Sequence, residues 1–132
     1  MTFLSKDDLW EVSSEIPYDD VRLVDPDGKY RGTMRVRGMT ADEAQVWQNA
    51  QMVTVGNKQR VDRRDAASKL VLLTVVKEDF SPFFEKSDLL KIRKMPAWIL
   101  NALTEAAIKQ SGMSEDAKVE IEEDFDPAQS ED

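Results

Sequence analysis

Apolar residues are densest in the segment RDAASKLVLLTVV at residues 64–76, and this segment dominates the expected fold. With the 3.6-residue period of a helix, Leu70 and Leu73 share one face, whereas Leu72 and Val76 fall on the opposite side. The alternative is a buried strand, because the run ends in β-branched residues. The polar lead-in DRRDAASK contains strong helix formers and no turn signal, which favours a helix. We therefore predict a central helix that other elements cover on several sides.

A hairpin is predicted upstream of this helix. VRLV at 21–24 and YRGTMRVR at 30–37 flank the sequence DPDG, in which proline presets one turn angle and glycine accepts positive φ. Alternation along the second strand puts Arg31, Arg35 and Arg37 on one face, so we expect a half-buried sheet with a basic outer face. The two aspartates of DPDG also suggest calcium, but the other ligands of a calcium loop are missing and a turn is favoured.

Capping signals predict the remaining helices. Thr40 and Glu43 form a capping box that opens a helix to about residue 53, and Gly56 then ends it. Ser87 caps a short helix, and Pro96 suits the first turn of the last one. The fold class is therefore α+β and predominantly helical, with one β-hairpin followed by about four helices packed around a central helix. The expected bounds are about 20–37 for the hairpin and 40–53, 62–77, 87–94 and 96–111 for the helices, with Leu70, Val71, Leu73 and Val76 in the core.

Charge divides the chain into three expected parts. Residues 1–17 form an amino-terminal arm that scatters apolar groups among acids and could carry a short helix over 6–14, opened by Ser5 and Asp8. Residues 18–114 form the globular body. Residues 115–132 hold nine acids and one lysine, a net charge of −8, whereas residues 1–114 sum to zero. We expect this acidic tail to be largely disordered, either as a solubilising segment or as a contact for a basic partner.

The composition excludes much chemistry. The chain has no cysteine and no histidine, which removes thiol chemistry, the commonest metal ligand and every triad that needs an imidazole. It contains no Gly-rich phosphate loop and no HExxH, CxxC or GxSxG motif, so we expect no enzyme, cofactor or metal. The basic residues at 58–64 could form a nucleic-acid-binding patch, but Asp62 lies among them and Asp65 follows them. This argues against a nucleic-acid-binding function. No apolar run is long enough for a membrane helix, and the start lacks signal-peptide features.

Aromatic residues supply the best candidates for a binding role. The sequence KEDFSPFFEK brings three phenylalanines into one loop, and Trp98 falls outside the apolar stripe of its helix. Trp98 could pack under this loop or serve as an exposed anchor for a partner, and both interpretations stay open. The partner-binding candidates are Phe80, Phe83, Phe84, Trp98, Arg31, Arg35 and Arg37.

Residues 30 to about 117 resemble the tail assembly chaperones of long non-contractile-tailed bacteriophages, the siphophage type. The resemblance lies in MRVRGMTADEAQVW, then AASKLVLLTVVKED, then a short DLLKI helix and PAWILNALTEAAIKQSGMSED. It covers about two thirds of the chain and concerns the order of elements with loosely shared residue types. The segment 1–17 has no clear counterpart in it.

The resemblance implies a small, mainly helical late protein of virion assembly without catalytic activity, located in the host cytoplasm. Members of that family coat the tape measure protein, a long and aggregation-prone helical rod, and help to recruit tail tube subunits. Many are also made in a longer form by a ribosomal frameshift. The expected partners are the tape measure protein, the tail tube protein and other copies of the chain, with no nucleic acid and no membrane.

Two other functional classes remain possible interpretations of the sequence. One is a small acidic binding or inhibitor protein that acts on a basic or DNA-binding partner, which would need acids spread over a folded surface. The other is a structural head–tail or tail-tube component, but those proteins are usually rich in β-structure.

Overall fold

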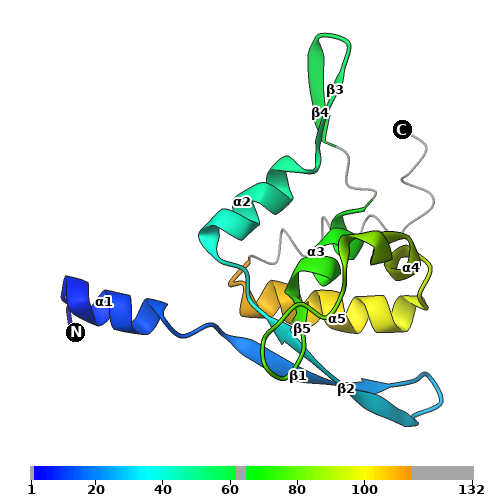
Figure 1. Cartoon of the computed structure of the whole chain (residues 1–132), viewed down its shortest axis with the longest axis horizontal. Helices are drawn as coiled ribbons and strands as arrows, with labels where there is room; N and C mark the ends of the chain where they lie inside the picture. Colours follow the sequence, from blue (N-terminus) through cyan, green and yellow to red (C-terminus); the bar gives the residue numbers. More distant parts are fainter. Residues whose placement is uncertain (1, 62–64, 114–132) are drawn as a thin grey trace.

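Two helices lie at the centre of the fold, with a sheet on one side of them (Figure 1). The computed structural model describes residues 2–61 and 65–113. Helix α5 (Ala97–Gln110) contacts both the central helix α3 (Ala66–Thr74) and the first hairpin, and α3 also contacts α4 (Leu89–Arg93). The architecture is mixed, with helices and small antiparallel sheets.

The predicted hairpin is confirmed. Strand β1 (Tyr18–Val24) pairs antiparallel with β2 (Tyr30–Arg37), and the short β5 (Val75–Val76) pairs with the other side of β2. Asp25 organises the turn, because one oxygen of its carboxylate accepts the amides of Asp27 at 3.0 Å and Lys29 at 2.9 Å. Its other oxygen lies 3.4 Å from Arg31. The carboxylate therefore serves the turn, as the favoured interpretation of DPDG requires.

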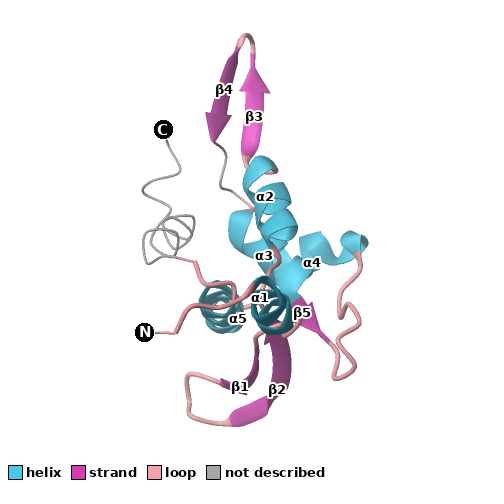
Figure 2. Ribbon diagram, turned by 90° about the vertical axis from the view of Figure 1, so that its left-hand side faces the viewer, coloured by secondary structure: helices cyan, strands magenta, loops and turns pink. Residues whose placement is uncertain are grey.

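The segment after the Thr40 capping box departs from the prediction. Helix α2 (Ala41–Asn49) begins at the predicted capping box but ends before residue 53. A second hairpin follows, formed by β3 (Met52–Val55) and β4 (Lys58–Val61), and it projects away from the body (Figure 2). Gly56 has φ +64°, which suits the first central position of a two-residue hairpin turn. The β-branched sequence VTV prefers the pleated strand over the last helical turn, so the expectation of one hairpin was wrong.

The central helix forms the middle of the core. Leu70 and Val71 are fully buried among Ile92 of α4 and Leu103 of α5. Leu73 is only half-buried, contrary to expectation. The helix ends at Thr74 rather than near residue 77, because the following two valines pair with β2. The helix and strand predictions for this segment are therefore each correct in part, because a helix is followed directly by a short strand.

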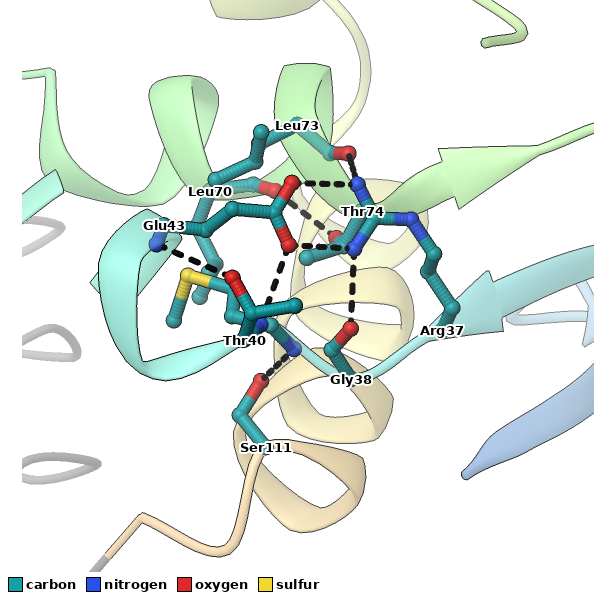
Figure 3. A network of polar contacts seen from close by, with 9 residues as sticks. Arg37, Gly38, Thr40, Glu43, Leu70, Leu73, Thr74 and Ser111 are labelled. Carbon is teal, nitrogen blue, oxygen red and sulfur yellow. Dashed lines mark hydrogen bonds and ion pairs between the residues drawn. The ribbon is translucent and has the colours of Figure 1, made fainter. Parts of the chain in front are cut away.

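A polar network joins the end of β2 to three helices (Figure 3). The guanidinium of Arg37 donates two hydrogen bonds of 2.7 Å to the carboxylate of Glu43 at the start of α2. It also donates to the carbonyl oxygens of Gly38 at 2.9 Å and of Leu73 at 3.2 Å. Met39 N–H donates to the hydroxyl of Ser111, beyond α5, at 2.9 Å. Arg37 and its neighbours thus tie the sheet to α2, α3 and α5.

The amino-terminal helix stands apart from the body (Figures 1 and 2). Helix α1 (Lys6–Ser13) has the predicted capping box of Ser5 and Asp8, and none of its residues is buried. The predicted acidic tail at 115–132 lies outside the described residues. Within residues 2–61 and 65–113, no helix combines the length and apolar character that a bilayer crossing demands.

Candidate functional site

The aromatic loop, residues 77–84, has an unusual backbone at Phe80. In the turn, Lys77 N–H donates to the carbonyl oxygen of Ser81 and Phe80 N–H donates to that of Lys77, both at 2.9 Å. The first hairpin repeats this pattern, since Asp25 N–H donates to Lys29 at 2.9 Å and Gly28 N–H to Asp25 at 2.8 Å. Gly28 has φ +88° and Phe80 has φ +67°, so a phenylalanine occupies the position that glycine holds in the matching turn.

Left-handed backbone is costly for a bulky residue. Among the described residues, Phe80 is the one non-glycine residue with positive φ. Such a conformation persists when surrounding contacts favour it strongly, and it often marks a position with a role.

The ring of Phe80 is held by Tyr18 and Arg35. Its centroid lies 5.1 Å from that of Tyr18, in an edge-on arrangement with an interplanar angle of 81°. The guanidinium carbon of Arg35 lies 4.4 Å from the Tyr18 centroid and 5.0 Å from the Phe80 centroid. One cation therefore contacts both rings, a favourable electrostatic arrangement that gives the loop a defined position on the sheet.

Hydrogen bonds orient the same guanidinium. Arg35 donates to both carboxylate oxygens of Asp20, at 2.7 and 2.9 Å, and to the backbone carbonyl of Glu78 at 2.9 Å. The hydrogen bonds from Arg35 lower the pKa of Asp20. Because Asp20 lies directly opposite Arg35 in the β1–β2 pairing, the hairpin register sets this contact.

The two remaining phenylalanines have different environments. Phe84 is half-buried and packs against the core, and its ring meets that of Phe83 edge-on with centroids 4.9 Å apart. Phe83 N–H donates to the carbonyl of Val75 at 3.2 Å, which fastens the loop to the short strand β5. Phe83 is 47% exposed and Phe80 is 40% exposed. The loop therefore presents two rings to solvent on a support fixed at both ends.

The other predicted site residues lie elsewhere. Trp98 is half-buried in α5 and packs against the core, so it offers less surface to a partner than Phe83 does. Arg31 pairs with Asp25 beside the hairpin turn, and Arg37 belongs to the network of Figure 3. Of the three arginines, Arg35 is the one whose guanidinium lies over a ring of the aromatic loop, that of Phe80.

Sequence reasoning missed Tyr18 and Asp20. Tyr18 precedes the predicted hairpin and Asp20 stands at its expected start, and neither residue carries a motif of its own. The pairing register of the hairpin could have identified them. Once the DPDG turn is placed, Asp20 lies opposite Arg35, and Tyr18 lies two positions before Asp20 on the same face of the sheet.

The arrangement suits contact with an apolar surface. Within the described part of the chain, no group of three or more acidic residues is placed to hold a metal ion. Hydrogen bonds from Arg35 lower the pKa of Asp20, so this carboxylate is unsuited to taking up a proton at neutral pH. Exposed aromatic rings on a rigid loop are typical of contact sites for apolar protein surfaces.

Comparison with known proteins adds no relative: no protein-family model matches the sequence, no curated protein matches it, and no solved structure matches the fold.

Proposed function

We propose that this protein is a tail assembly chaperone of a long non-contractile-tailed bacteriophage, which binds the tape measure protein, keeps it soluble and helps to recruit tail tube subunits. The resemblance of residues 30 to about 117 to that family, described above, supports the proposal. The single observation that carries it is the exposure of Phe80 and Phe83 on the aromatic loop, because an aggregation-prone client needs apolar cover.

The rigidity of the loop favours binding to amphipathic helices. Tyr18 and Arg35 hold the Phe80 ring before any partner arrives, so little conformational entropy remains to be lost on binding. A rod with many similar apolar stripes would bind many copies of the chaperone. Each contact can then be weak while the coat as a whole persists, since neighbouring sites lie on one molecule.

Four carboxylates of the body favour this function over an acidic inhibitor. Asp20, Asp25, Glu43 and Asp65 each form an ion pair with an arginine of the same chain. An inhibitor that imitates nucleic acid needs carboxylates free to meet a basic partner, and these four are already engaged.

Co-expression with the tape measure protein of the same phage tests the proposal. The wild-type chain should keep that partner in the soluble fraction and co-purify with it. The variant Phe80→Ala/Phe83→Ala should recover about tenfold less partner, the loss expected when central aromatic contacts are truncated. A parallel pull-down with the tail tube protein, with and without the tape measure protein, tests recruitment.

Tyr30→Ala is the matched control. Tyr30 is 49% exposed, close to the value for Phe83, but it lies at the far end of β2 and its ring contacts Arg22. This variant should leave co-purification unchanged. The chaperone proposal fails if the wild-type chain leaves the tape measure protein as insoluble as it is alone, or if Tyr30→Ala reduces binding as much as the loop variant does.

A further inference from the structure

The helix of the amino-terminal arm is well formed and has no partner in the described chain. In its capping box, Asp8 N–H donates to the Ser5 hydroxyl and Ser5 N–H donates to the Asp8 carboxylate, both at 3.1 Å. Yet Trp10 is 60% exposed, and the other large apolar residues of the arm are exposed as well: Phe3, Leu4, Leu9, Val12 and Ile16.

Such a helix needs a surface to pack on. An eight-residue helix is marginal in water on its own, since the cost of nucleation is spread over few hydrogen bonds. Six exposed apolar side chains lie within this one short segment, which makes it a target for association. The arm is also acidic: residues 1–17 contain four carboxylates and one lysine, a net charge of −3.

The same chain carries a surface of complementary character on α4 and the 3₁₀ turn before it, η1 (Lys86–Asp88). Leu90 is 60% exposed there, although Ile92 on the opposite side is fully buried and fixes the helix to the core. Lys86 and Lys94 flank Leu90 four residues away on either side, and Lys91 follows it. Residues 85–94 hold four bases and two acids, a net charge of +2.

We propose that α1 of one copy docks on the α4 surface of a second copy, with Trp10 and its apolar neighbours covering Leu90 and the arm carboxylates facing the lysines. Opposite charge and exposed apolar side chains on both surfaces make them complementary. In the arm sequence, Asp8 and Glu11 flank the apolar pair Leu9 and Trp10, just as Lys91 follows Leu90 on the other surface.

A second copy, and not the same copy, supplies the surface. In Figure 1, α1 and α4 lie at opposite ends of the longest axis. The linker between α1 and β1, residues 14–17, spans at most about 14 Å when fully extended. Each copy then offers one arm and one α4 surface, so the contact is head-to-tail and joins more than two copies into a ring or an open chain.

Analytical ultracentrifugation of the full chain over a concentration series tests this docking without any partner protein. The wild type should form species larger than a monomer, and added salt should weaken them. Trp10→Ala should raise the dissociation constant by about tenfold or more, as for other aromatic anchors. At concentrations where the wild type is monomeric, the melting temperature of Trp10→Ala should equal that of the wild type, because α1 buries no residue within one copy.

Charge reversal identifies the two surfaces. Glu11→Lys/Glu15→Lys changes the arm, and Lys91→Glu/Lys94→Glu changes the α4 surface; each variant alone should be monomeric. An equal mixture of the two should associate again, because the reversed arm of one variant then meets the reversed α4 surface of the other. Lys29→Glu/Lys109→Glu, the same charge change at two exposed lysines elsewhere, should behave as the wild type does.

Three results would overturn the docking proposal. The first is a wild type that remains monomeric at every concentration. The second is association that resists the α4 variant while the arm variant abolishes it, which would assign the arm to another surface. The third is association that survives both arm variants but disappears when residues 115–132 are removed, which would make the acidic tail the occupant. Binding of the tape measure protein is measured separately, so failure here leaves the proposed function standing.

Discussion

Substitutions at Phe80 provide a direct measure of how the aromatic loop is held. In ordinary backbone, alanine is more stable than glycine by about 0.5–1 kcal/mol, because glycine loses more conformational freedom on folding. Phe80 has φ +67°, where a residue with a Cβ costs about 1–2 kcal/mol. The usual order should therefore be reversed, and Phe80→Gly should be more stable than Phe80→Ala by about 1 kcal/mol.

The wild type should have a higher free energy of unfolding than either Phe80→Ala or Phe80→Gly. Phe80→Ala loses the edge-on contact with Tyr18, which contributes about 0.5–1.5 kcal/mol. It also loses the contact with the Arg35 guanidinium, worth about 0.5–1 kcal/mol at an exposed site. We expect Phe80→Ala to lower the free energy of unfolding by about 1–2 kcal/mol, and Phe80→Gly to recover about half of that loss.

Gly28→Ala is the matched control, because the turn at Asp25 has the same hydrogen bonds and a glycine at the equivalent position. An added Cβ at Gly28 meets no atom within 4 Å, so this variant reports the backbone cost alone, about 1 kcal/mol. Urea unfolding followed by tryptophan fluorescence gives all the values, since Trp47 is buried. If Phe80→Ala proved as stable as Phe80→Gly while Gly28→Ala was destabilised, the left-handed backbone at Phe80 would be refuted.

Other substitutions test the core and the polar network. Leu70→Ala should destabilise by about 2–5 kcal/mol in the same urea assay, because Leu70 is fully buried in the central helix. Gly38→Ala should cost about 1–3 kcal/mol, since the new Cβ would lie 2.2 Å from the carbonyl oxygen of Gln110 and neither backbone can move freely; a neutral result would contradict this close approach. Hydrogen bonds from Arg37 lower the pKa of Glu43. The stabilisation they give is therefore complete above the ordinary carboxyl pKa and is lost as the pH falls through the lowered pKa. Arg37→Ala should remove that part of the acid dependence, which unfolding curves at a series of pH values would detect.

Local chemistry explains what the sequence predicted correctly. The two capping boxes, at Ser5 and at Thr40, each involve groups three residues apart. The DPDG turn depends on Asp25 and Gly28, which are equally close in the chain. Helix α5 matches its predicted bounds to within one residue, because a proline precedes it and a glycine follows it. Such features need no information from distant parts of the molecule.

The second hairpin was missed because two local signals compete. Residues 52–55 can extend the helical stripe of α2, and their β-branched members can equally form a strand. The competition is decided by pairing with residues 58–61 across the turn at Gly56. The end of the central helix is decided in the same way, because Val75 and Val76 become a strand only where β2 is present to pair with them.

The candidate site depended on the tertiary structure. Composition indicated a loop rich in phenylalanine, but not which rings stay exposed or what holds them. Phe80 meets Arg35 across 45 positions of the chain, and Tyr18 joins them from a third segment. The length of the hairpin, its register and the path of the loop after β5 all have to be in place before these groups can touch. Sequence determines caps, turns and apolar periodicity because they act over a few residues, whereas contacts between distant side chains exist only once the chain has packed.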